Sequence, residues 1–256
     1  MNETIRIASW NIAGARRMQS LKQFDYSGVD IEYFVNCLKE IDADIICLQE
    51  SHTNDEQSVA QDIAALLGGM PFVYNVAVSP SHIDNAFSLG NAILSKTELT
   101  HISDIQYPYP DFDLFFKDGR PAAVHQKMIQ IYKYNNAMIA NTQMLPLGIF
   151  GKSYASGDGA RLAAAIEQLL LDNLTSPLIF CGDMNFDAPH TIYPNLYKQL
   201  ELNEALPDTL TRPNKTMAKQ TPDHIVISSN LAVIQADVVE VEADHYLCYA
   251  DIIISD

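Results

Sequence analysis

The stretch Leu178-Ile179-Phe180-Cys181-Gly182-Asp183-Met184-Asn185-Phe186-Asp187 decides the fold. It begins as an apolar run typical of a buried strand, breaks at Gly182, and then presents Asp183 and Asn185 on alternate positions. Residues i and i+2 of an extended segment point to the same side, so both side chains are expected at one site. An acid and a carboxamide there suit a phosphate ester beside a divalent metal, although Asp and Asn are also common turn residues.

The composition indicates a globular chain. The sequence has 256 residues, of which 48% are hydrophobic, and this is ample for a core. No apolar run is long enough to cross a bilayer, and the polar start after Met1 lacks the features of a secretory signal. The cysteines are scattered without metal-ligand spacing, which favours free thiols and a reducing, cytoplasmic location. They are Cys37, Cys47, Cys181 and Cys248.

The charge argues against a general nucleic-acid binder. The net charge of −16 would repel long polyanions from the body of the protein. Basic residues nevertheless gather in probable loops, where they would steer one anionic substrate to a mouth, although any one of them is more simply a polar loop residue. They are Arg16, Arg17, Lys22, Lys117, Arg120, Arg212, Lys215 and Lys219.

The hydrophobic pattern predicts alternating and then consecutive elements. Strands are expected at residues 4–10, 44–48, 71–78, 89–95, 99–106, 122–133, 137–143, 178–182, 223–228, 231–241 and 246–254. Helices are expected at residues 31–41, 159–174 and 192–200, and another is expected to open at a capping box formed by Asn54 and Gln57. No linker divides the chain, so residues 1–256 are expected to form a single domain. The many consecutive strands favour an α+β fold with two packed sheets and outer helices over a doubly wound parallel sheet.

Polar residues fall where the predicted strands end. Asn11 follows the first strand, Glu50 follows the second, and Asp183 with Asn185 follows the strand at 178–182. The last two strands are opened by Asp223-His224 and by Asp244-His245. Strand ends that converge on one rim place a site on rigid elements, so we expect these side chains to lie together. His224 points away from Asp223 in a strand and is expected to be structural.

Taken together, these segments resemble the endonuclease/exonuclease/phosphatase superfamily over almost the whole chain. The segments are SWNIAG around Asn11, ADIICLQE ending at Glu50, LGNAILSK around Asn91, NTQML around Gln143, CGDMNFDAP around Asp183, TPDHIVIS at Asp223 and ADHYLCYADI at Asp244 and His245. Each match is weak by itself, and their shared order is what carries the resemblance. It implies a four-layer α/β/β/α sandwich of two mixed sheets with a metal-dependent phosphoester-cleaving site at one edge.

The resemblance also implies roles for these residues. Glu50 would bind Mg²⁺, or Mn²⁺ in its place, with Asn11 and Asp244 completing or orienting the oxygen ligands that such an ion prefers. Asp183 would align and deprotonate the attacking water. Asn185 would hold that water or donate to a non-bridging oxygen. His245 would contact the phosphate, oriented by Asp223, because a carboxylate partner favours the imidazolium form.

Position 143 departs from the family pattern. Where many relatives have Asn-Thr-His-Leu, this chain has Asn141-Thr142-Gln143-Met144. In those relatives the histidine contacts the scissile phosphate, and the repair nucleases have tyrosine there. Gln143 still donates a hydrogen bond but carries neither a charge nor an acidic proton. This argues against a pancreatic-type deoxyribonuclease and removes one candidate acid.

These observations favour a metal-dependent phosphoesterase that acts on a phosphodiester. The substrate is expected to be a nucleic-acid end, a short oligonucleotide or a small diester. One alternative is a phosphomonoesterase or lipid-headgroup hydrolase on the same scaffold, and another is a non-catalytic binding module. The aromatic segment at residues 107–116 would either stack on a substrate or fold onto the core, and the sequence weighs these equally.

Overall fold

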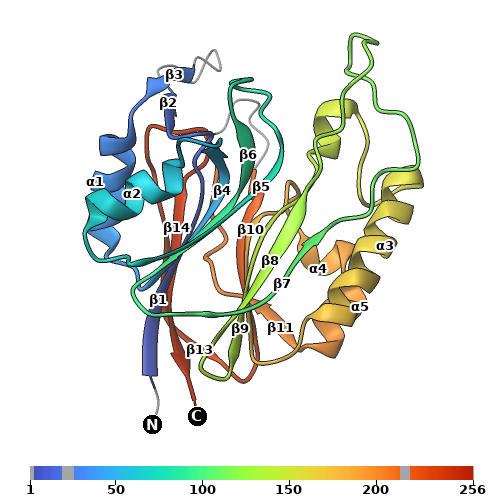
Figure 1. The fold of residues 1–256 in the computed structure, drawn as a ribbon. Helices are drawn as coiled ribbons and strands as arrows, with labels where there is room; N and C mark the ends of the chain where they lie inside the picture. The colour runs from blue at the N-terminus through green and yellow to red at the C-terminus, as the bar shows by residue number, and fades with distance from the viewer. Residues whose placement is uncertain (1–2, 19–25, 214–219, 256) are drawn as a thin grey trace.

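The computed structural model describes residues 3–18, 26–213 and 220–255. Lys22, Lys215 and Lys219 lie outside these residues, so their expected place in basic loops is not described. Two large sheets form the centre of the protein (Figure 1).

The first sheet has the strand order β13-β14-β1-β4-β6-β5. The strands are β1 (Glu3–Asn11), β4 (Ile45–Thr53), β5 (Phe72–Pro80), β6 (Ser88–Ser95), β13 (Ala232–Val239) and β14 (Leu247–Ile254). The sheet is mixed, because β1 and β4 run parallel while the other neighbouring strands run antiparallel. The carboxyl ends of β1 and β4 therefore meet at one edge.

The second sheet has the strand order β11-β12-β10-β9-β8-β7. The strands are β7 (Thr100–Gln106), β8 (Met128–Tyr134), β9 (Ala137–Gln143), β10 (Leu178–Asp183), β11 (Leu202–Glu204) and β12 (Asp223–Ser228). It is also mixed, with β9 and β10 parallel and the other neighbours antiparallel. Each sheet thus has a parallel pair at its centre whose carboxyl ends lie together.

Helices cover the outer faces of the two sheets, which gives the expected α/β/β/α sandwich (Figure 1). The helices α1 (Ile31–Ile41) and α2 (Val59–Leu67) lie on the first sheet, and α3 (Gly157–Asn173), α4 (Pro189–Ile192) and α5 (Pro194–Gln199) lie on the second. A 3₁₀ helix, η1 (Leu147–Phe150), and a small sheet of β2 (Arg16–Met18) and β3 (Tyr26–Val29) complete the elements.

Three hydrophobic clusters hold these layers together. Trp10 and Phe34 belong to the cluster between the first sheet and its helices, and Phe180 belongs to the cluster under α3 and α5. The third cluster lies between the sheets and includes Ile7 and Ile179. Neighbouring residues of one strand therefore face different layers, which explains why the central strands are apolar on both faces.

Several expected boundaries differ from the structure. The expected strand at 122–133 begins only at Met128, although it continues to Tyr134. The capping box at Asn54 and Gln57 was wrong as a helix start. Asn54 accepts hydrogen bonds from a turn, and α2 begins after Ser58, whose hydroxyl accepts from the Gln61 backbone amide. The short strands β2, β3 and β11 were not expected, because three or four residues carry too little periodicity to be recognised.

The cysteines match the expectation of free thiols. All of them are unpaired, and Cys47, Cys181 and Cys248 are buried. Within the described part of the chain, every helix is too short or too polar to span a lipid bilayer.

Candidate active site

The register of the second sheet brings expected site residues into one row. Asp183 is the last residue of β10, and it pairs with Gln143 on β9 and with Asp223 on β12. Across the gap between the sheets, Asn11 ends β1 and pairs with Gln49, the residue before Glu50. The strand ends thus converge as the sequence predicted.

The carboxylate of Asp183 is buried and fixed from two sides. Asn11 Nδ2 donates to Oδ2 at 3.0 Å, and the backbone amide of Asn185 donates to Oδ1 at 3.0 Å. The first bond crosses from one sheet to the other. Two donors on separate elements therefore fix the direction in which Asp183 presents its oxygens.

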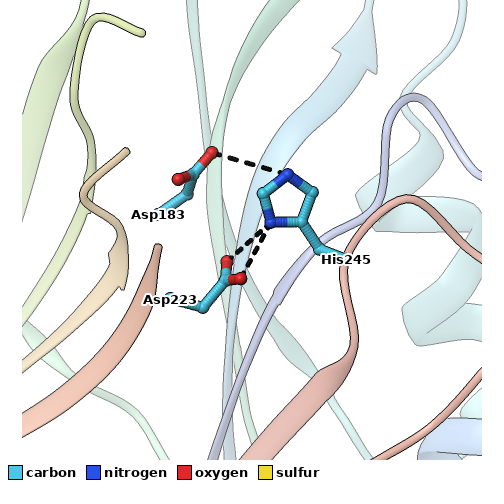
Figure 2. Close-up of side chains that lie close together, drawn as sticks. All are labelled: Asp183, Asp223 and His245. Carbon is cyan, nitrogen blue, oxygen red and sulfur yellow. Dashed lines mark hydrogen bonds and ion pairs between the residues drawn. The ribbon is translucent and has the colours of Figure 1, made fainter. Parts of the chain in front are cut away.

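His245 lies between Asp183 and Asp223 (Figure 2). Its Nδ1 is 2.8 Å and 3.0 Å from the two Asp223 oxygens, and its Nε2 is 3.9 Å from Asp183 Oδ2. The indole of Trp10 donates to the His245 carbonyl at 2.9 Å. The predicted pairing of His245 with Asp223 is present, and Nε2 is directed toward Asp183.

The electrostatics of these groups favour a protonated His245 and a basic Asp183. Burial lowers the pKa of His245, but the Asp223 and Asp183 carboxylates outweigh it and raise that pKa to about 9. Burial also raises the pKa of Asp183, against the opposing effect of His245. At neutral pH the imidazolium therefore carries a positive charge beside a carboxylate that accepts protons more readily than usual.

Glu50 lies at a bulge in β4 and is partly exposed. The pairing of β4 with β6 shifts register between Leu48 and Ser51, and Glu50 has a φ of 54°. Burial raises the pKa of Glu50, but the electrostatic effect of Lys127 and the other surrounding groups outweighs burial, so the net shift of this pKa is downward. The carboxylate is therefore ionised at neutral pH and available to a cation.

Gln143 bridges Glu50 and a lysine that the sequence did not single out. Its Nε2 donates to Glu50 Oε1 at 2.6 Å, and its Oε1 accepts from Lys127 Nζ at 2.6 Å. Both Gln143 and Lys127 are buried. No local pattern marks Lys127, because it stands before an apolar strand and was expected to lie within it.

The oxygen ligands predicted for a metal ion are close to the site but have partners. Asn11 Oδ1 accepts from the Ala13 backbone amide at 3.1 Å. Asp244 accepts from Arg212 Nε at 3.2 Å and from its Nη2 at 2.6 Å. Glu50 accepts from Gln143 through Oε1, which leaves Oε2 as the atom for a cation. An oxygen-only set with an ionised carboxylate fits Mg²⁺ or Mn²⁺.

A second group of potential metal ligands consists of Asp183, Asp223 and His245. One ligand atom from each lies within 4.8 Å of the others. His245 Nδ1 is already bonded to Asp223, and the two carboxylates raise the pKa of His245 to about 9. The group is therefore described by its contacts as a carboxylate–imidazolium cluster.

The side chain of Asn185 points elsewhere than the sequence suggested. Its Nδ2 donates to the Met144 carbonyl at 2.9 Å, and its φ of 58° places it in the left-handed region. In this structure the backbone amide of Asn185 serves the site by holding Asp183. His224 is buried against Glu204 and the Phe186 carbonyl, which agrees with the structural role expected for it.

Buried polar contacts tie the two sheets together below the site. Asn141 Nδ2 donates to the Leu48 and Ala92 carbonyls at 3.1 Å and 3.0 Å. Gln49 Nε2 donates to Asn141 Oδ1 at 2.8 Å. These buried hydrogen bonds cross from one sheet to the other and so help to fix the relative position of the sheets, on which the distance between Asn11 and Asp183 depends.

The aromatic segment at residues 107–116 is partly buried and partly exposed. Tyr107 and Leu114 are buried, and the Tyr107 hydroxyl hydrogen-bonds Thr142 at 2.6 Å. Tyr109, Phe115 and Phe116 are exposed on the surface. Tyr107 therefore folds onto the core and supports β9, while stacking of the exposed aromatics on a substrate stays a prediction.

Comparisons with known proteins agree with the fold. The sequence model described as "Endonuclease/Exonuclease/phosphatase family" matches residues 8–256. A search of curated proteins returned no significant match. Among solved structures, a protein of this family from Bacteroides thetaiotaomicron is 16% identical, with a TM-score of 0.67, over 100% of this chain and 96% of that chain.

Two further structures carry named activities. A mannosyl-6-phosphatase from Bacteroides thetaiotaomicron is 17% identical, with a TM-score of 0.62, over 98% of this chain and 100% of that chain. ANGEL2, described as a 2',3'-cyclic phosphatase and solved with adenosine-2',3'-vanadate, is 16% identical, with a TM-score of 0.61, over 99% of this chain and 96% of that chain. At this level of sequence identity, these similarities show a shared fold only.

Proposed function

Because the chain belongs to the endonuclease/exonuclease/phosphatase family of phosphoester hydrolases, we propose that it hydrolyses a phosphodiester by attack of water. The observation that carries this proposal is the buried arrangement of Asp183 between Asn11 and His245. It places a fixed, basic carboxylate beside a cation, as required where a water molecule attacks an anionic ester.

Asp183 is proposed to orient the attacking water and to accept its proton. Its pKa is raised by burial, so it is a stronger base than a solvated carboxylate. The donors on Oδ1 and Oδ2 prevent rotation, which keeps one lone pair in a constant direction. A positioned base of this kind contributes about 10²- to 10⁴-fold to a rate.

His245 is proposed to stabilise the charge that develops on the phosphoryl group. Its Nδ1 is held by Asp223, so the proton on Nε2 is the one that can face a substrate oxygen. Arg212 is paired with Asp244 and would hold that carboxylate in position. Glu50, with Asn11 and Asp244, would hold a divalent ion, which when bound neutralises charge on a phosphoryl oxygen.

The supply of positive charge favours a diester over a monoester. Among the described basic groups at the site, Arg212 is paired with Asp244, and Lys127 is bonded to Gln143. His245 is therefore the cation best placed to meet the substrate. A diester carries one negative charge and a monoester about −1.5 to −2 at neutral pH, so the diester meets less repulsion from the carboxylates of Asp183, Asp223 and Glu50.

The test is hydrolysis of bis-p-nitrophenyl phosphate and p-nitrophenyl phosphate with Mg²⁺ or Mn²⁺, against EDTA. We expect metal-dependent turnover of the diester, and Asp183→Ala is expected to lower kcat by about 10³-fold. The exposed Asp172→Asn on α3 is the matched control and should leave kcat unchanged. The proposal would be contradicted if the diester were still hydrolysed at the same rate in EDTA and by the Asp183→Ala variant.

A nucleic-acid substrate can be separated from a small diester by salt. For an oligonucleotide, affinity should fall steeply with added salt, because each phosphate that the protein contacts releases counterions. A flat response, together with the net charge of −16, would favour a small diester. Binding of a fluorescent oligonucleotide at several salt concentrations distinguishes the two.

A phosphomonoesterase is the second candidate. The mannosyl-6-phosphatase shares this fold over almost the whole length of both chains, so the scaffold is compatible with that activity. Turnover of p-nitrophenyl phosphate alone would favour it. In that case Lys127 would be expected to contribute positive charge to the site through Gln143.

A further inference from the structure

The amide of Gln143 has one permitted orientation, and Lys127 sets it. On one side Gln143 faces an ammonium group, which only donates hydrogen bonds, and on the other it faces the carboxylate of Glu50, which only accepts them. If the amide oxygen and nitrogen were exchanged, the NH₂ group would face the ammonium of Lys127 and the oxygen would face the carboxylate of Glu50, so neither hydrogen bond could form. The oxygen must therefore face Lys127, and the NH₂ group must face Glu50.

Lys127 is a buried cation with an unusual partner. Only 9% of its surface is exposed, and among the described residues its ammonium has Gln143 as its hydrogen-bond partner and no ion-pair partner. Burial lowers the pKa of Lys127, while Glu50 and Asp183 oppose this from a distance. Because water is largely excluded around Lys127, it screens the electrostatic interaction between the ammonium and the Gln143 amide only weakly.

We propose that Lys127 is a positioning residue that holds Gln143 with its NH₂ group toward the substrate and strengthens that group as a donor. An ammonium bonded to an amide oxygen draws electron density from the amide nitrogen, and hydrogen bonds in such a chain strengthen one another. One N–H meets Glu50, and the other can meet a phosphoryl oxygen. This role rests on the proposed phosphoester hydrolysis.

This arrangement gives a physical reason for glutamine at position 143. A histidine there would have its protonated form disfavoured by the ammonium of Lys127. Glutamine cannot carry a charge, but it can transmit the influence of one. Lys127 and Gln143 together thus supply positive polarity where many relatives have a charged or acidic side chain.

The test is a double-mutant cycle on the full chain, with bis-p-nitrophenyl phosphate and Mg²⁺. We expect Lys127→Met to lower kcat by about 10- to 100-fold, the range for a lost hydrogen bond to a charged group. The control is Lys133→Met, which removes an exposed lysine from β8, the strand that directly follows Lys127, and should change kcat by less than about twofold. Lys127→Arg keeps a cationic donor and should restore part of the activity.

The cycle separates a positioning role from direct contact with substrate. If Lys127 acts through Gln143, Lys127→Met should cost less than about threefold in a Gln143→Met background, because the two residues then act as a unit. An equal cost in both backgrounds would overturn the inference, and so would equal effects of Lys127→Met and Lys133→Met.

A second readout does not depend on catalysis. The side-chain amide resonance of Gln143, assigned by its loss in Gln143→Met, should shift in Lys127→Met but not in Lys133→Met in a ¹H–¹⁵N spectrum. An unchanged resonance would overturn the inference even if the enzyme is active. A shifted resonance in a protein that hydrolyses no phosphoester would instead count against the proposed function and leave the contact between Lys127 and Gln143 established.

Discussion

The two flanks of the site are built from opposite arrangements of charge. The histidine flank is defined as Asp183, Asp223 and His245. In it the imidazolium lies between two carboxylates, with Asp223 in direct contact at 2.8 Å and Asp183 at 3.9 Å. In the glutamine flank, defined as Glu50, Gln143 and Lys127, one neutral amide separates a carboxylate from a cation.

This difference separates proton chemistry from binding. The carboxylates of the histidine flank raise the pKa of His245 to about 9 and so keep a proton on the imidazole. In the glutamine flank the central group is an amide, which has no acidic proton and carries no charge. We therefore expect the histidine flank to control the reaction and the glutamine flank to orient what is bound.

Disrupting the strand pair that carries both flanks should have the largest effect. Gly182 has a φ of 141°, and a Cβ there would lie 1.9 Å from the Thr142 carbonyl oxygen on β9. Gly182→Ala must therefore force β9 and β10 apart and is expected to cost more than about 3 kcal/mol of unfolding free energy.

Urea denaturation measures this cost, with Gly148→Ala as the matched control. A Cβ at Gly148 meets nothing within 4 Å. The control should change stability by less than about 1 kcal/mol. Equal stability of the two variants would mean that the close approach of β9 and β10 does not constrain the site.

Removing the carboxylate partner of His245 should reduce activity next most strongly. In Asp223→Asn the burial of His245 is no longer offset by this charge, so its pKa falls and less imidazolium is present at neutral pH. We expect kcat to fall by about 10²- to 10³-fold, with the remaining activity shifted to lower pH. A full pH–rate profile would show this shift. A uniform loss at every pH would indicate that Asp223 acts only by shaping the site.

The raised pKa of His245 also predicts how stability depends on pH. Because the pKa of the folded state lies above the usual 6.5, the folded state binds the proton more tightly than the unfolded state. This stabilisation is complete below pH 6.5 and is lost as the pH rises through about 9.

Unfolding free energy in EDTA should therefore fall by about 3 kcal/mol over this range of pH. The His245→Asn variant should flatten the dependence, and the exposed His190→Asn should keep it. If His245→Asn retains the full slope, another group is responsible for it.

Placing a histidine in the glutamine flank should have the smallest effect while Lys127 is present. In Gln143→His the ammonium of Lys127 opposes protonation of the imidazole, so kcat should change by less than about threefold. In the Lys127→Met background the same substitution should raise kcat by about tenfold, since the opposing charge is gone. Steady-state kinetics of the four proteins measures both steps. A gain above about tenfold in Gln143→His alone would show that Lys127 does not compensate for the missing histidine.

Much of this arrangement could be predicted from the sequence. Apolar alternation and the order of the motifs indicated the two sheets, and the polar residues at strand ends indicated where Asp183, Asp223 and His245 would meet. The expected strand at 122–133 concealed Lys127, because a lysine beside an apolar strand has no local feature that separates it from a solvated one. The start of α2 was misplaced for a similar reason, since Asn54 caps a turn in the same way that it would cap a helix.

The sequence by itself determined which strands exist and which kinds of side chain stand at their ends, because these depend on the local period and on residue types that neighbouring residues reveal. The tertiary structure decided which of those side chains touch. The contacts of Lys127 with Gln143, of Gln143 with Glu50 and of Arg212 with Asp244 join residues that are far apart in the chain. Their existence depends on strand register and on how the two sheets pack, and no local pattern encodes either.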